Sequence, residues 1–107
     1  MISTHVLDTS LGSPAEGIKV TLQKKQNSAW QDVSTKITNA DGRIAFDCES
    51  LPGTYMLTFE IESYLQQKSA DFFFLQAPII FKIENVTRKY HVPLLLNPFG
   101  YSTYRGS

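Results

Sequence analysis

Residues 89–96 read Lys-Tyr-His-Val-Pro-Leu-Leu-Leu, and this stretch decides the fold class. Its apolar residues recur at every second position: Tyr90, Val92, Leu94 and Leu96. A period of two is the period of a β-strand, whose side chains alternate between the two faces of a sheet. If this apolar set faces the core, His91 points to the outer face.

The same alternation recurs along the chain. It predicts strands over residues 18–23, 55–61 and 79–84, with weaker candidates at 4–8, 30–35 and 101–105. Turn-forming sequences lie between these segments, at residues 12–14, 39–42, 52–53 and 97–100. Residues 61–69 alone have a helix-forming composition. Strands and turns at this spacing, without a helix between successive strands, predict an all-β sandwich rather than a βαβ fold.

The length and composition fit one small globular domain over residues 1–107. The chain has 107 residues, of which 42% are hydrophobic, so it can build a core. Ten basic and ten acidic residues cancel, which argues against nucleic-acid and polybasic membrane partners. The longest apolar stretches, 72–75 and 94–96, are too short for a membrane-spanning helix.

The cysteine and histidine counts limit the kinds of site. Cys48 is the single cysteine, so an intrachain disulfide is excluded. His5 and His91 are the only histidines, and no metal-ligand spacing is present, so we expect no metal site. The first residues show neither a basic nor an apolar signal region, which favours a cytoplasmic protein. A periplasmic protein whose signal peptide had been removed would give the same sequence.

Both histidines are expected on the outer face of one sheet. His5 alternates with Val6 in the same way that His91 alternates with Val92. Pro93 and Leu95 share the face of His91, so this strand is apolar on both sides. Such a strand is normally covered on both faces. In so small a protein the cover would be another subunit, and the histidines would lie near a subunit interface.

Two histidines and nearby arginines form a possible acid–base and anion-binding set. Histidine exchanges protons near neutral pH, and arginine binds planar anions through paired N–H donors. Arg43 follows an Asp-Gly turn and should begin a strand, and Arg105 lies close to the end of the chain. The alternative is that these side chains are ordinary polar residues on a solvated surface. Pattern alone therefore reaches a small β-sandwich that forms an oligomer.

Two segments resemble the transthyretin-like family. The first is Thr4-His5-Val6-Leu7-Asp8-Thr9, followed by Gly12-Ser13-Pro14-Ala15. The second runs from Tyr90-His91-Val92-Pro93 to the ending Tyr104-Arg105-Gly106-Ser107, and it is the more specific of the two. The ending resembles the 5-hydroxyisourate hydrolase branch of the family, because the hormone-carrier branch lacks it. Asp41-Gly42-Arg43 and residues 53–59 are also similar, so the resemblance covers nearly the whole chain.

The resemblance implies a fold, an assembly and an activity. The fold would be a two-sheet sandwich of about eight strands with one short helix. The assembly would be a homotetramer, a dimer of dimers, with active sites between the dimers. The activity would be hydrolytic ring opening of 5-hydroxyisourate to 2-oxo-4-hydroxy-4-carboxy-5-ureidoimidazoline, a step of urate degradation towards allantoin. No metal or organic cofactor is implied.

The resemblance also assigns site residues. By matching position, the catalytic residues would be His5, Arg43, His91 and Ser107. The substrate-binding residues would be these together with Tyr104, Arg105 and Gly106. The sequence departs from the family pattern at Lys89, where many relatives have histidine, and at Asn97, where serine is usual. Neither departure touches a catalytic position.

Two other classes of function compete with this interpretation. A transthyretin-type carrier would bind an apolar or aromatic ligand in its channel, where His5, Arg43 and His91 would be unfavourable. A structural or adhesion sandwich module would need neither the paired histidines nor an arginine near its terminus. An enzyme with a small anionic substrate fits these residues better than either alternative.

Overall fold

The computed structural model describes residues 1–48 and 51–106. These residues form nine strands, of which β2 has only two residues, and one helix. The strands are β1 Ile2–Asp8, β2 Ser13–Pro14, β3 Lys19–Gln26, β4 Ala29–Ile37, β5 Arg43–Phe46, β6 Gly53–Glu60, β7 Gln76–Ile83, β8 Tyr90–Asn97 and β9 Gly100–Thr103. The helix is α1, Glu62–Lys68. The sandwich predicted from the alternation, with its single short helix, is confirmed.

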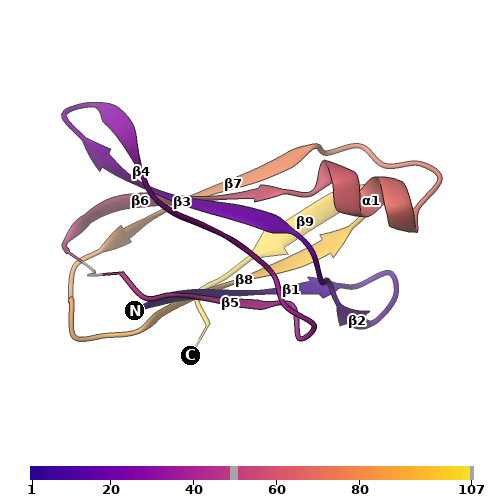
Figure 1. Cartoon of the computed structure of the whole chain (residues 1–107), viewed down its shortest axis with the longest axis horizontal. Helices are drawn as coiled ribbons and strands as arrows, with labels where there is room; N and C mark the ends of the chain where they lie inside the picture. Colours follow the sequence, from indigo (N-terminus) through magenta and orange to yellow (C-terminus); the bar gives the residue numbers. More distant parts are fainter. Residues whose placement is uncertain (49–50, 107) are drawn as a thin grey trace.

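The strands form two layers, as Figure 1 shows. One sheet has the order β4-β3-β6-β7. The other has the order β2-β1-β8-β9, and β5 pairs with β1 on the same side as β2. In these orders β7 and β9 are edge strands. Each has one side without a partner strand among the described residues.

The period-two pattern fills the space between the layers. In β8 the side chains of Tyr90, Val92, Leu94 and Leu96 are buried, while His91 is half-buried on the other face. In β6 the buried residues are Tyr55, Leu57 and Phe59. Each fully buried aliphatic or aromatic side chain stabilises the fold by roughly 1.5–3 kcal/mol, so this core fixes which face of each strand turns outward.

The two strands that carry the histidines lie side by side at the centre of one sheet. β1 and β8 run parallel and pair over seven positions, from Ile2 opposite Tyr90 to Asp8 opposite Leu96. Inside the layer, the buried Thr4 hydroxyl donates a hydrogen bond of 2.6 Å to the carbonyl of Val92. This pairing joins segments from the two ends of the chain and holds both histidines on a rigid element.

The end of β1 and the segment between α1 and β7 depart from the simple strand pattern. The side chain of Asp8 is buried, and its Oδ2 accepts a hydrogen bond of 2.7 Å from the Tyr64 hydroxyl, which ties α1 to the end of β1. The apolar stretch 72–75 lies between α1 and β7, with Phe73 exposed, rather than in a strand. Among the described residues, α1 is too short and too polar to cross a bilayer.

Candidate active site

His5, Arg43 and His91 lie on the outer face of the sheet formed by β1, β5 and β8. His5 and Arg43 are direct partners in the antiparallel pairing of β1 with β5. On the other side of β1, His91 is the partner of Ser3, two residues before His5. Both histidines are half-buried and Arg43 is exposed. The structure thus brings the three residues together on one face, which the alternation predicted for the two histidines.

A tight turn sets the position of Arg43. The N–H of Gly42 donates to the carbonyl of Asn39 at 2.8 Å, and the Asn39 side chain accepts hydrogen bonds from the N–H groups of Asp41 and Arg43. Gly42 has a φ of +72°, in the left-handed region that favours glycine. Its carbonyl accepts from the N–H of Val6, beside His5. The turn therefore places Arg43 at the strand position opposite His5.

Replacing Gly42 by alanine should destabilise the protein more than replacing Gly12. Both glycines have positive φ, +72° and +69°, so alanine would be strained at either position by about 1–2 kcal/mol. A Cβ at Gly42 would also lie 2.5 Å from the Val6 carbonyl oxygen, whereas one at Gly12 meets nothing within 4 Å. Urea unfolding of Gly42→Ala and Gly12→Ala measures the difference. Equal losses would contradict the close contact with Val6.

The surroundings of both histidines favour their neutral form. Burial, followed by the Arg43 guanidinium, lowers the pKa of His5 below its usual value, against a weaker opposing effect of Asp41. Burial, then Arg43, then His5 lower the pKa of His91. A neutral imidazole can accept a proton at physiological pH, which an imidazolium cannot. The site therefore combines two proton acceptors with one positive charge.

A serine that the sequence reasoning did not identify touches one of the histidines. The Ser3 hydroxyl lies 2.8 Å from Nδ1 of His91, at hydrogen-bond distance. Ser3 is on β1, and the two residues are 88 positions apart in the chain. The contact depends on the parallel register of β1 and β8, which no local pattern reveals.

The end of the chain folds back along β8. The N–H of Gly106 donates a hydrogen bond of 2.8 Å to the carbonyl of His91, and these two residues form an isolated antiparallel bridge. The Gly106 Cα lies against the imidazole, so that a Cβ there would be 2.6 Å from Cδ2 of His91 and 3.2 Å from Cγ of Pro93. The backbone at Gly106 therefore forms one wall of the pocket that holds the His91 ring.

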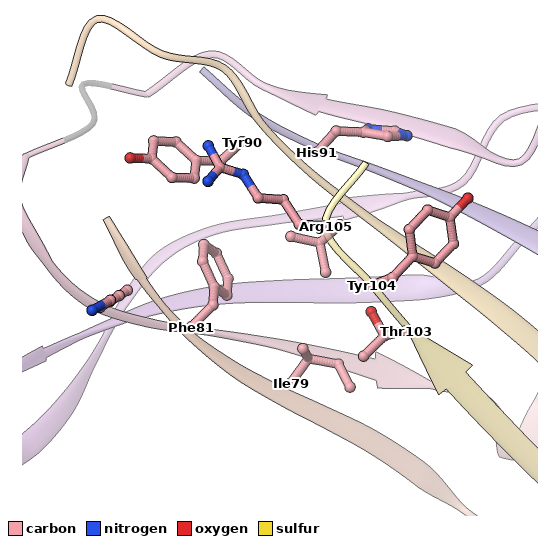
Figure 2. A pocket seen from close by; sticks show the side chains of 9 residues that line it. Ile79, Phe81, Tyr90, His91, Thr103, Tyr104 and Arg105 are labelled. Atoms are coloured by element: carbon pink, nitrogen blue, oxygen red, sulfur yellow. The ribbon is translucent and has the colours of Figure 1, made fainter. Parts of the chain in front are cut away.

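Arg105 lies on the other side of this terminal segment. Its guanidinium carbon is 5.0 Å from the centroid of the Tyr90 ring, which is the geometry of a cation–π contact. Figure 2 shows this guanidinium directed towards Tyr90 and away from the His91 ring. The alternation predicted a strand over residues 101–105, but β9 ends at Thr103, and Tyr104 lines the same groove as Thr103 and Arg105. A contact between Arg105 and the substrate remains a prediction.

A groove of about 350 Å³ lies beside His91. Its walls come from β7, β8, the end of β9 and the terminal segment, residues 104–106. The wall residues are Ile79, Phe81, Lys82, Tyr90, His91, Val92, Thr103, Tyr104 and Arg105. Figure 2 looks into this groove. His5 and Arg43 are not among its wall residues, so the polar face and the largely apolar groove meet only at His91. The polar face itself is not enclosed by the described residues of one chain.

The remaining predicted site residues divide into two groups. Tyr104 is exposed, and it lines the groove next to His91. Ser107, predicted to be the residue closest to the chemistry, lies outside the described residues.

Among residues 1–48 and 51–106, no three His, Cys, Asp or Glu side chains gather in a way that could hold a metal ion.

Comparisons with known proteins place these features in context. A family model described as the HIUase/Transthyretin family matches residues 2–106. A probable 5-hydroxyisourate hydrolase of Caenorhabditis elegans is 42% identical over 109 residues, which cover 99% of this chain and 81% of the relative. The solved structure of Klebsiella pneumoniae 5-hydroxyisourate hydrolase is 38% identical with a TM-score of 0.86, over 99% of this chain and 98% of the other. Sea bream transthyretin, solved in complex with thyroxine, is 25% identical with a TM-score of 0.91, over 98% and 93% of the two chains.

Proposed function

This chain belongs to the HIUase/Transthyretin family, and we propose that it is a 5-hydroxyisourate hydrolase. The observation that carries the proposal is the grouping of His5, Arg43 and His91 on one sheet face, with both histidine pKa values lowered. Relatives that are 38–42% identical over almost the whole chain are named as hydrolases for this substrate. The product would be 2-oxo-4-hydroxy-4-carboxy-5-ureidoimidazoline.

The reaction adds water to an acyl carbon of the ring and breaks the adjacent C–N bond. One neutral histidine accepts a proton from the attacking water as its oxygen bonds to the carbonyl carbon. Negative charge then develops on the carbonyl oxygen, and the tetrahedral species collapses with cleavage of the C–N bond. The imidazolium just formed returns this proton to the leaving nitrogen, directly or through the other histidine, so that both histidines end neutral. His5 and His91 take these proton-transfer roles in our proposal.

Arg43 and the chain end bind and orient the substrate in this proposal. The substrate is flat and rich in carbonyl oxygens, which suits a guanidinium that offers two parallel N–H donors. Arg43 also stabilises the negative charge that develops during attack, because it is the fixed positive group next to His5. Tyr104, Gly106 and Ser107 would complete the wall beside His91, with Ser107 near the reacting atoms. The chemistry uses no metal or organic cofactor.

A carrier of the transthyretin type is the alternative. It would use the same fold, which the likeness to sea bream transthyretin supports. Two histidines and an arginine on the face that would meet the ligand disfavour an apolar occupant, because each would lose water without gaining a partner. The higher identity to the hydrolases also favours the enzyme.

An ultraviolet assay tests the proposal directly. Urate oxidase generates 5-hydroxyisourate from urate, and the decay of its absorbance is followed with and without this protein. We expect a decay rate that rises in proportion to the protein concentration. A decay rate equal to the spontaneous one, for a folded preparation, would overturn the proposal. Tight binding of an aromatic ligand without turnover would favour the carrier.

The pH dependence of the hydrolysis should show histidines that stay neutral to unusually low pH. Their ordinary pKa is about 6.5, and burial together with Arg43 lowers both values. The proton-accepting form therefore persists below pH 6.5, so the acid limb of kcat/KM is expected there. A pH–rate profile under first-order conditions measures it. An acid limb above pH 6.5 would contradict the assigned surroundings of the histidines.

We also propose a homotetramer that closes the site. Leu7 and Leu95 are half-buried on the same outer face as the histidines, and β7 and β9 are edge strands. Edge strands pair readily with a second copy, and an apolar face is stabilised by cover. Size-exclusion chromatography with light scattering should give a mass near four times 12.1 kDa. A fully active monomer would contradict this assembly.

A further inference from the structure

The contact between Ser3 and His91 assigns a function to a residue outside the proposed catalytic set. The Ser3 Oγ lies 2.8 Å from Nδ1 of His91 in a half-buried position, and this is the only side-chain hydrogen bond of either residue among the described parts of the chain. On the opposite side the ring meets the Cα of Gly106. The imidazole is thus held between a hydroxyl on β1 and the backbone of the terminal segment.

We propose that Ser3 is a positioning residue that fixes the orientation of the His91 ring, so that Nε2 is the nitrogen presented to the substrate. A histidine has two ring nitrogens, and a partner on one determines which is free for chemistry. With Nδ1 engaged by Ser3, only Nε2 remains available. This inference rests on the proposed hydrolase function for its catalytic consequence, but the contact itself can be measured without activity.

A hydroxyl suits this task better than a carboxylate. A serine hydroxyl both donates and accepts, so it can pair with Nδ1 whether or not that nitrogen carries the proton. The ring can then hold one position while Nε2 takes up and releases a proton. A carboxylate at the same place would favour the imidazolium and raise the pKa of His91. Ser3 therefore orients the ring without opposing the effects of burial and Arg43, which keep it neutral.

The charged groups and the other histidine near the His91 ring come from three strands and the terminal segment. Arg43 on β5 and His5 on β1 act on its charge. Lys82 on β7 and Arg105 in the terminal segment line the groove that His91 borders. None of these is an acid. In the described part of the chain, the groups named here around the ring are neutral or basic, and Ser3 is its one side-chain hydrogen-bond partner.

Nuclear magnetic resonance of the histidine rings tests the contact. His5 and His91 are the only histidines, so 15N-histidine labelling gives two sets of ring signals, which His5→Asn and His91→Asn assign. Ser3→Ala and Ser3→Cys should change the tautomer balance and the ring 15N shifts of His91 and leave those of His5 nearly unchanged. Ser3→Thr, which keeps a hydroxyl, should retain the parent His91 signals. Identical His91 signals in the parent, Ser3→Ala and Ser3→Cys would overturn the proposal, whether or not the protein hydrolyses 5-hydroxyisourate.

Kinetics then test the catalytic consequence. Ser3→Ala should lower kcat about 10-fold with little change in KM, because Ser3 acts through His91 and does not touch the substrate. Ser3→Thr should recover most of this loss. Ser34→Ala, a half-buried serine on β4 of the other sheet, is the matched control and should leave both constants unchanged. Parent kinetics in Ser3→Ala, with His91→Asn inactive, would overturn the positioning role and leave the hydrolase assignment intact.

Replacing Ser3 by a carboxylate predicts the direction in which the pKa of His91 changes. In Ser3→Asp the pKa of His91 should rise, so the acid limb of the pH–rate profile should move to higher pH. A merely structural role for Ser3 would lower the rate or the stability without moving that limb. An unmoved limb in a folded, active Ser3→Asp protein would therefore contradict the assignment.

Discussion

His91→Asn is expected to lower the rate of 5-hydroxyisourate hydrolysis about 100-fold or more, since acid–base catalysis by a positioned side chain contributes about 10²–10⁴. Asparagine is of similar size and polar, but it cannot exchange a proton near neutral pH. The hydroxyisourate decay assay with purified variant and parent measures the change. The loss should appear in kcat, because the proton transfers occur in the transition state.

The fold of this variant should remain intact. His91 lies on the outer face of β8, whereas the core is formed by the alternate residues of the strand. Substitutions outside the core usually change stability by less than about 0.5 kcal/mol. Circular dichroism and light scattering are the structural controls, and Lys89→Asn, an exposed change two residues earlier, is the matched variant. Near-parent activity of His91→Asn would remove His91 from the mechanism.

His5 permits a check on whether the two histidines act together. His5→Asn should produce a loss of similar size, because each histidine serves one step of the same proton transfer. If the two histidines act as a unit, the fold-loss of activity in the double variant should be much smaller than the product of the two single fold-losses. Multiplicative losses would indicate independent roles.

The alternation of residues predicted the faces of the strands because the core imposes it. In β8, four buried apolar side chains leave His91 a single face to occupy, and the same holds for His5 beside Val6 in β1. The Asp-Gly turn likewise predicted that Arg43 begins a strand. These features depend on neighbours within a few residues, and the periodicity of a strand is sufficient to place them.

The features that the sequence did not predict depend on pairings across the whole chain. Ser3 contacts His91 because β1 and β8 run parallel in one register, and a shift of this register would break the contact. Residues 72–75 have the composition of a buried strand, yet they form an exposed connection between α1 and β7. Hydrophobicity alone does not distinguish a strand inside one chain from a surface that a second copy would cover.

The side chain of Arg105 makes a contact that the sequence did not predict. Family resemblance predicted that it binds the substrate, and the alternation predicted that it continues the strand of Thr103, but β9 ends at Thr103. The structure places its guanidinium on the ring of Tyr90, whose hydroxyl in turn accepts hydrogen bonds from the N–H groups of Glu84 and Asn85. Arg105 therefore ties the end of the chain to the body of the sandwich, whatever contact it makes with a ligand.

Deletion of Tyr104–Ser107 is expected to abolish most of the activity, by about 100-fold, while the sandwich persists. The deletion removes the hydrogen bond from Gly106 to His91, the wall against the imidazole and the contact of Arg105 with Tyr90. A displacement of a catalytic group by about 1 Å can cost roughly 10²-fold in rate. Residues 104 and 105 are exposed, so their removal takes little from the core. The decay assay and circular dichroism measure the two expectations separately.

Gly106→Ala tests the contact between Gly106 and the His91 ring apart from the other residues of the terminal segment. A single methyl group would lie 2.6 Å from Cδ2 of His91, so the ring or the backbone must shift, and we expect the shift to disturb the Ser3 contact or the Gly106 hydrogen bond. Its activity should therefore fall towards that of the deletion, although the chain keeps Ser107. Arg105→Met, which keeps an unbranched side chain over Tyr90 and removes the charge, should lose less, because Gly106 remains in place. Parent rates in the deletion variant would show that the terminal segment takes no part, and parent rates in Gly106→Ala alone would assign the effect of the deletion to Ser107 or Tyr104 instead of the wall beside His91.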